Sequence, residues 1–158
     1  MLAGKFLMFR LIVALCCTSL LAGCFSLGGG APASYKGYVQ RYGMYLASAD
    51  VDNSCISPKL KAMLGSFERK FGRKVVLNSG YRDPIRNILA GGEDSSFHMK
   101  CMAADIFVPG VDKRSLIAFA MKNPQVGGLG CYPGSNYIHV DVRDRPRGRN
   151  TPVTFSGC

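Results

Sequence analysis

The spacing of apolar residues between Ser57 and Gly72 predicts a helix. Ser57 is a favourable N-cap, Pro58 suits the first helical position, and Gly72 is typical of a helix end. The apolar residues between them share one face of a helix with 3.6 residues per turn. They are Leu60, Met63, Leu64, Phe67 and Phe71.

Two further helices are predicted from the same signals. Asp83 and Pro84 repeat the cap-and-proline start, so we expect a short helix that ends at Gly91-Gly92. Asp112 caps a third helix that runs to about Lys122. Its buried face consists of Leu116, Ile117, Phe119, Ala120 and Met121.

Four segments favour strands because they are short, apolar and bounded by turn residues. They are residues 74–78, 102–108, 127–132 and 137–142, and the turn 133–136 joins the last two. Helices between the earlier strands and a hairpin at the end predict an α+β fold, with a small antiparallel sheet flanked by helices. Residues 35–49 have no clear period and stay unassigned.

The N-terminus is typical of an export signal. Lys5 and Arg10 lie on the N-terminal side of an apolar run of 12 residues, Leu11 to Ala22. This run is too short to span a membrane comfortably. Leu21-Ala22-Gly23-Cys24 resembles a bacterial lipobox, which implies cleavage before Cys24 and a lipid on its thiol. The alternative is an ordinary secretory signal with an incidental cysteine.

Three regions follow from this reading. Residues 1–23 are the predicted signal peptide, residues 24–54 hold the lipidated N-terminus, a Gly/Pro linker and the unassigned segment, and residues 55–158 form the functional domain. Loss of Lys5 and Arg10 with the signal lowers the formal charge from +10 to +8. A basic exported domain favours a membrane surface or an acidic cell-wall polymer as partner. We expect no nucleic-acid partner, because the chain has no such binding motif.

The tail that contains Arg143, Arg145, Arg147 and Arg149 is interpreted as solvated surface; the alternative is a segment that grips an anionic polymer.

Besides the lipidated Cys24, four cysteines remain after the predicted processing: Cys55, Cys101, Cys131 and Cys158. An even number in an oxidising compartment indicates up to two disulfides, with three pairings open. A four-cysteine zinc site is disfavoured because no two of these cysteines are close in sequence.

The two histidines of the chain are the candidate metal ligands. Asp105 lies in the apolar strand that follows His98, where a carboxylate is costly unless it is paired or bound to a cation. His139 and Asp141 are two positions apart on a predicted strand, so they point to the same face. Two imidazoles and a carboxylate suit zinc, and a fourth position open to water makes such a site catalytic. The alternative is that these residues are unrelated core or surface positions.

An ordered series of motifs gives these residues a context. The series is Ser79-Gly80-Tyr81-Arg82-Asp83-Pro84, Asn87, Gly91-Gly92, Ser95-Ser96-Phe97-His98-Met99, Ala103-Ala104-Asp105-Ile106, Gly127-Gly128-Leu129-Gly130 and His139-Val140-Asp141. Over about residues 55–145 the chain resembles the D-Ala-D-Ala metallopeptidases, especially the murein endopeptidases. The resemblance implies the α+β fold shared with zinc carboxypeptidases, lysostaphin-like enzymes and the hedgehog domain.

The resemblance also implies roles for individual residues. It makes His98, Asp105 and His139 the ligands of Zn²⁺, gives Arg82 the contact to a substrate carboxylate or carbonyl oxygen, and places Ser96 near the substrate. The implied activity is zinc-dependent hydrolysis of amide bonds in peptidoglycan stem or cross-link peptides, by a murein endopeptidase or a D,D-carboxypeptidase.

Two positions depart from the family pattern. Cys101 stands where the family usually has glycine, which suggests a disulfide from Cys101 to Cys131 and leaves Cys55 with Cys158; the alternative is a buried free thiol. Asn136 stands where many zinc carboxypeptidases have the glutamate that activates water. Asp141 is then either the catalytic base or a residue that orients a ligand, and the second role is favoured.

Two other functions stay open: a non-catalytic, zinc-containing lipoprotein that binds the cell wall, and a structural lipoprotein with an accidental triad. In every case we expect a monomer in the cell envelope, lipid-anchored and facing the periplasm. Phe25 after the lipidated cysteine weakly favours the outer membrane.

Overall fold

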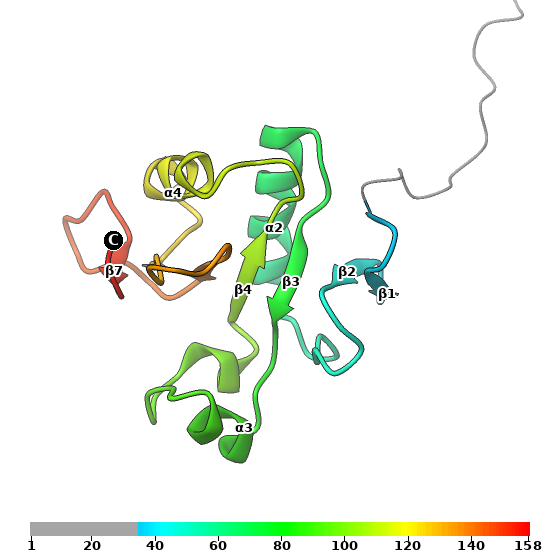
Figure 1. Cartoon of the computed structure of the whole chain (residues 1–158). Helices are drawn as coiled ribbons and strands as arrows, with labels where there is room; N and C mark the ends of the chain where they lie inside the picture. The colour runs from blue at the N-terminus through cyan, green and yellow to red at the C-terminus, as the bar shows by residue number, and fades with distance from the viewer. Residues whose placement is uncertain (1–34) are drawn as a thin grey trace, which may run out of the picture. The chain divides into compact units, whose positions relative to one another are not determined.

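A mixed sheet of seven strands organises residues 35–158, the part of the chain that the computed structural model describes (Figure 1). The predicted signal peptide (1–23), the lipidation site Cys24 and the linker 28–34 lie outside these described residues.

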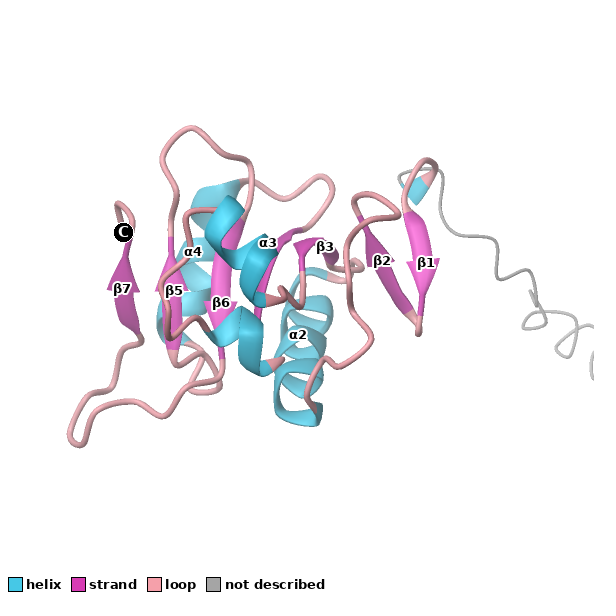
Figure 2. Ribbon diagram, turned by 90° about the horizontal axis from the view of Figure 1, so that it is seen from below, coloured by secondary structure: helices cyan, strands magenta, loops and turns pink. Residues whose placement is uncertain are grey.

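The strands lie side by side in the order β1-β2-β3-β4-β6-β5-β7 (Figure 2). Pairs β2–β3 and β5–β7 are parallel, and the other four pairs are antiparallel. The α+β prediction is confirmed, and the sheet is larger and more mixed than the sequence indicated. The bounds are β1 Val39–Arg41, β2 Met44–Leu46, β3 Val76–Ser79, β4 Ala103–Phe107, β5 Gly128–Gly130, β6 Ile138–Asp141 and β7 Val153–Phe155.

The α-helices of the described residues begin where the capping residues predict: α2 Pro58–Phe71, α3 Pro84–Leu89 and α4 Lys113–Lys122. The 3₁₀ helix η2 Phe97–Lys100 was not predicted. Ser57 Oγ accepts a hydrogen bond from Leu60 N at 3.2 Å, and Gly72 ends α2 with a left-handed φ of 62°. Asp83 and Asp112 cap α3 and α4 in the same way. Within residues 35–158 no helix has the length and apolarity needed to cross a membrane.

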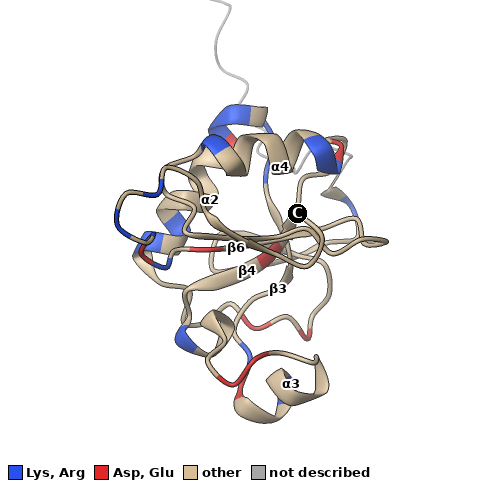
Figure 3. Ribbon diagram, turned by 90° about the vertical axis from the view of Figure 1, so that its left-hand side faces the viewer, with Lys and Arg blue, Asp and Glu red and all other residues tan. Residues whose placement is uncertain are grey.

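Helices α2 and α4 lie on one side of the sheet, and α3 lies on the other (Figure 3). The side chains that the sheet shares with α2 and α4 form the core: from β4 and β6 these are Ala104, Ile106, Ile138 and Val140. Because side chains alternate along a strand, Asp105, His139 and Asp141 point to the opposite face. The alternation of side chains along these strands therefore places apolar residues in the core and three polar residues on the opposite face of the sheet.

All four cysteines of the described residues are in disulfides, but the predicted pairing is wrong. Cys55 is bonded to Cys101 with a Cα–Cα distance of 5.5 Å, and Cys131 is bonded to Cys158 at 4.9 Å. Strand β6 lies between β4, which follows Cys101, and β5, which precedes Cys131. This intervening strand separates the two cysteines that the sequence analysis paired.

Cys101 ends η2 with a left-handed φ of 58°. Glycine is favoured in that conformation, which accounts for the family's glycine at this position. Here the disulfide to Cys55 and the hydrogen bond from Ser57 N to the Cys101 carbonyl (2.9 Å) hold the turn against the start of α2.

Candidate active site

Three buried side chains from three elements converge beside the sheet. His98 comes from η2, Asp105 from β4 and His139 from β6, and each is at most 4% exposed. Asp105 and His139 are direct partners in the β4–β6 register. His139 Nδ1 lies 3.1 Å from His98 Nε2 and 3.2 Å from Asp105 Oδ1, and His98 Nε2 lies 3.4 Å from the same oxygen. The sequence-predicted ligands are thus brought together.

Hydrogen bonds on the far side of each ring determine which nitrogen carries the proton. His98 Nδ1 is 2.6 Å from the Gly80 carbonyl, which only accepts, so Nδ1 donates and Nε2 keeps its lone pair. His139 Nε2 is 3.2 Å from Asp141 Oδ2 and donates to this carboxylate, which leaves the lone pair on Nδ1. In the neutral rings, two nitrogen lone pairs and one carboxylate oxygen therefore face one another.

Such a cluster of acceptors fits a cation. In a tetrahedral site with bonds of about 2.0–2.1 Å, neighbouring ligand atoms are about 3.3 Å apart. The three separations here are 3.1, 3.2 and 3.4 Å. Burial by itself raises the pKa of Asp105, but contacts with His139 and His98 outweigh it and hold the pKa below its usual range. The carboxylate is therefore ionised at neutral pH and able to ligate a metal.

Arg82 lies against this cluster, in the turn between β3 and α3. Its Nε donates to Ser79 Oγ at 2.8 Å and its Nη2 pairs with Asp105 Oδ2. Among residues 35–158 its Nη1 has no hydrogen-bond partner, and the side chain is 15% exposed. The guanidinium is thus fixed on one edge and free on the other.

Asp141 is fully buried and engaged through both carboxylate oxygens. Oδ1 accepts from Arg143 N at 3.0 Å and from Arg143 Nε at 2.9 Å, while Oδ2 accepts from His139. Burial raises the pKa of Asp141, but the hydrogen bonds from His139 and Arg143 prevail and lower it to about 2. Asp141 does not line the cavity beside the cluster.

That cavity has a volume of about 620 Å³ and opens onto the three converging side chains. Ser96, another predicted site residue, lies in its wall, where its Oγ caps η2 by accepting from His98 N at 3.3 Å. The cavity also has an aromatic lining that the sequence analysis missed: Phe97, Tyr132, Tyr137 and Phe155.

Arg143 is a further lining residue that the sequence analysis missed. We interpreted the arginine-rich tail as solvated surface, and this is wrong for Arg143 and Arg145, which are half-buried and hydrogen-bonded. Arg147 and Arg149 are exposed. The alternation of His139 and Asp141 on β6 continues to Arg143, and this period could have identified it. Phe155 had no local signal, because β7 reaches the site only by pairing with β5.

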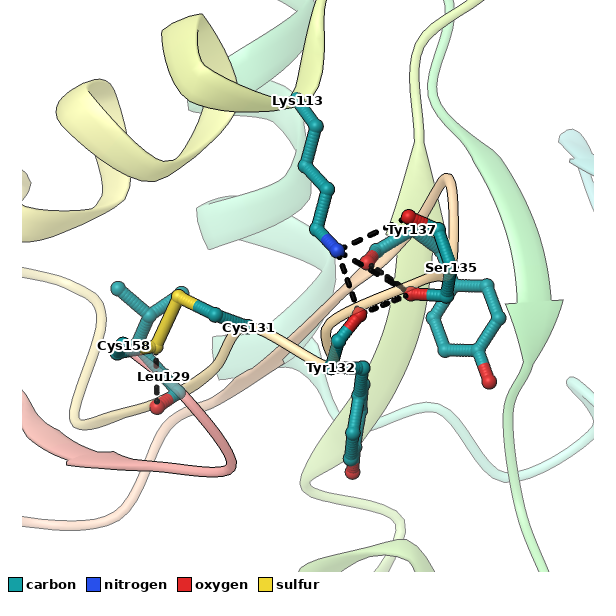
Figure 4. Close-up of a disulfide and its surroundings, with 7 residues drawn as sticks. All are labelled: Lys113, Leu129, Cys131, Tyr132, Ser135, Tyr137 and Cys158. Atoms are coloured by element: carbon teal, nitrogen blue, oxygen red, sulfur yellow. Dashed lines mark hydrogen bonds between the residues drawn. A yellow bond between two sulfur atoms is a disulfide. The ribbon is translucent and has the colours of Figure 1, made fainter.

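The turn that carries Tyr132 and Tyr137 is held by Lys113 from the start of α4 (Figure 4). Lys113 Nζ donates to the carbonyl oxygens of Tyr132 (2.7 Å) and Ser135 (2.9 Å). Tyr132 has a left-handed φ of 42°, and the preceding Cys131 is fixed by its disulfide. The Lys113 ammonium group, the disulfide of Cys131 and the backbone conformation of Tyr132 together hold this wall of the cavity in position.

The glycines of residues 127–130 allow the close approach of β5 to the site. A Cβ on Gly128 would lie 2.2 Å from Asp141 Oδ2 and 2.7 Å from Arg143 Nε, and a Cβ on Gly127 would lie 1.9 Å from the Arg143 carbonyl oxygen. A Cβ on Gly130 would lie 2.7 Å from the Phe155 ring. Any larger residue would displace the groups that support His139.

Comparison with known proteins agrees with this geometry. The chain is similar to the peptidoglycan L,D-endopeptidases MepK of Escherichia coli K12 and Shigella flexneri: each is 33% identical over 89 residues, which cover 53% of this chain and 46% of the relative. The chain thus spans about half the length of the curated relatives it matches. The family model described as peptidase M15 matches residues 37–141, well over half of the chain and all of the converging side chains. The chain therefore belongs to the peptidase M15 family.

Proposed function

We propose that the protein is a zinc-dependent hydrolase of amide bonds in peptidoglycan peptides, with His98, Asp105 and His139 as the zinc ligands. The observation that carries the proposal is the convergence of three acceptor atoms at 3.1–3.4 Å in a buried cluster that lines a cavity. Bound zinc lowers the pKa of a water molecule and polarises a carbonyl group. The substrate class is taken from the name of the MepK relatives.

The residues around the ligands have separate tasks in this proposal. The Gly80 carbonyl and Asp141 hold the two imidazoles in the tautomers that ligation requires. Arg82 uses its free Nη1 edge to hold a carbonyl or carboxylate oxygen of the substrate, while its pairing with Asp105 fixes the plane of the guanidinium. Ser96 positions His98 and contributes to the wall beside the substrate.

We assign Asp141 to orientation and not to proton transfer. A base must reach the substrate or its water, and Asp141 is outside the cavity with both oxygens engaged. Asn136 is exposed and also lies outside the cavity lining. The cavity lining contains two carboxylate residues, Asp105 and Glu93, and Asp105 is a proposed zinc ligand. We therefore propose to test Glu93 as the catalytic base.

Release of soluble muropeptides from purified peptidoglycan tests the function. Zinc-loaded protein should release peptide fragments, 1,10-phenanthroline should stop the release, and added zinc should restore it. His98→Ala should lose both zinc and turnover, whereas Glu93→Gln should keep zinc and lose turnover. Folded wild-type protein that takes up no zinc would contradict the proposal.

A non-catalytic wall-binding role is the second candidate, because Asn136 replaces the glutamate of related carboxypeptidases. Stoichiometric zinc and binding to peptidoglycan without any released fragment would favour this role over hydrolysis.

We further propose that the protein works in the cell envelope, which the two disulfides support because such bonds persist in oxidising compartments. Lipidation at Cys24, attachment to the outer membrane and a monomeric state stay predictions. Mass spectrometry of membrane-extracted protein should find an acylated Cys24 as the first residue, and light scattering should give the monomer mass.

A further inference from the structure

A second arginine, Arg143, forms part of the cavity wall and is arranged like Arg82. Its Nε donates to Asp141 at 2.9 Å and its Nη2 pairs with the same carboxylate, just as Arg82 donates from Nε and Nη2 to Ser79 and Asp105. Among the described residues 35–158, Nη1 of Arg143 has no hydrogen-bond partner. The side chain is 26% exposed and lines the cavity.

The Arg143 guanidinium is rigidly placed before any ligand arrives. Its Cζ lies 4.4 Å from the centre of the Phe97 ring and 5.7 Å from that of Phe155, and both rings line the cavity. Stacking on aromatic faces and pairing with Asp141 fix the plane, so little side-chain entropy is lost when Nη1 binds an oxygen. Apolar rings beside the cation also lower the local dielectric constant, which strengthens a charged contact.

The charged lining of the cavity is balanced before a cation binds. It consists of Arg82, Arg143, Asp105 and Glu93; Arg82 is paired with Asp105, and Arg143 is paired with the buried Asp141. A divalent cation at the cluster would make the net charge around the cavity positive. A peptide with a free carboxylate therefore suits this cavity better than a neutral one.

We propose that Arg143 binds a carboxylate of the peptide substrate through Nη1, next to the contact made by Arg82. The inference rests on the proposed function and specifies its substrate class: peptides that carry a free carboxylate close to the bond that is cut. Arg143 is then a residue that determines specificity, in addition to its support of Asp141.

A cycle of substrate and protein changes tests the inference. The probes are a peptidoglycan stem tetrapeptide with free carboxylates and the same peptide with its carboxylates amidated. For each peptide we measure kcat/KM with zinc-loaded protein. We also measure Kd by calorimetry with zinc-free protein, which should bind the peptide without cleaving it. Wild type should prefer the free peptide by about 10- to 100-fold, the range expected for a charged hydrogen bond.

Arg143→Met should remove this preference by weakening the free peptide more than the amidated one; a loss common to both peptides reports the support that Arg143 gives to Asp141. Arg143→Lys, which keeps a positive charge for Asp141, should also lose most of it, because one ammonium cannot hold Asp141 and the ligand in the same geometry. Arg147→Met is the matched control: it removes a charge from the same segment at an exposed position outside the cavity, and should keep the preference. Zinc content is measured for every variant.

Equal losses for both peptides in the Arg143 variants would overturn the inference, because Arg143 would then act only through Asp141. A wild type without preference, or a preference that survives in Arg143→Met, would overturn it as well. If zinc-loaded wild type cleaves neither peptide and releases no fragment from purified peptidoglycan, the proposed hydrolysis fails, while the calorimetric comparison still decides whether Arg143 binds the carboxylate.

Discussion

Asp141→Asn is the substitution that separates orientation from proton transfer at this site. The amide keeps the shape of the carboxylate but replaces one oxygen by an NH₂ group. If this group faces His139, it cannot accept the proton of Nε2; if it faces Arg143, two donors oppose each other. The variant must therefore lose one of the two contacts that the buried carboxylate makes at once.

The structure sets the expected size of both effects. Loss of a group that orients a metal ligand lowers zinc affinity or activity by about 10- to 100-fold. Loss of a charged hydrogen bond to the half-buried Arg143 lowers the free energy of unfolding by about 1.5–3 kcal/mol. Activity at saturating zinc should fall by no more than the orientation effect.

Competition with a fluorescent chelator measures zinc affinity, urea unfolding in excess zinc measures stability, and muropeptide release measures kcat. Asp144→Asn is the control, because Asp144 is 97% exposed and pairs with Lys59 away from the cavity; zinc affinity should not change. The reasoning is refuted if Asp141→Asn keeps full zinc affinity and stability but loses turnover by about a thousandfold or more, since such a loss is typical of a general base.

Three further changes have definite expected outcomes. Gly128→Ala places a methyl group against the Asp141 carboxylate, so the free energy of unfolding should fall by about 1–3 kcal/mol and zinc affinity should fall with it; unaltered zinc binding would contradict the close approach. Replacement of Cys55 and Cys101 by serine opens a loop with a sequence separation of 46 and should destabilise the domain by about 4 kcal/mol in urea, while a loss below about 1 kcal/mol would show that the native strands already confine this loop. Tyr35→Phe removes a hydrogen bond of 2.9 Å and should cost about 1 kcal/mol at pH 7. Burial raises the pKa of Tyr35 in the folded state, so this contribution is complete below the unfolded pKa of about 10 and is lost as the pH rises through the folded pKa; the stability difference from wild type should shrink in urea titrations at alkaline pH, and a constant difference would argue against it.

The helices and the inner strands were predictable because their signals are local. Ser57 with Pro58, and Asp83 with Pro84, mark helix starts by their own side-chain and backbone chemistry. The hairpin β1–β2 and strand β7 were not predictable, because three-residue strands have too few positions for a period and depend on neighbours that are remote in sequence.

The same distinction between local signals and signals that depend on remote residues applies to the site. Spacing on single strands, with the family motifs, placed His139 and Asp141 on one face and identified Asp105 as an unusual buried acid. The disulfide pairing could not be predicted, because it depends on the position of β6 between β4 and β5. Tyr132 also had no signal, since its role follows from a turn that Lys113 holds from another element.

The central position of β6 has a consequence for the metal site that we propose. β6 follows β5 in the chain, yet it lies between β4 and β5 and pairs with both. His98 and Asp105 precede β5, but the third donor, His139, and its support Asp141 arrive only when β6 docks. Non-local strand pairing of this kind is slow compared with helix formation. With the ligands that we propose, tight metal binding requires β6 to be docked, and a bound ion would in turn stabilise the completed sheet, so folding and metal binding of this domain would be coupled.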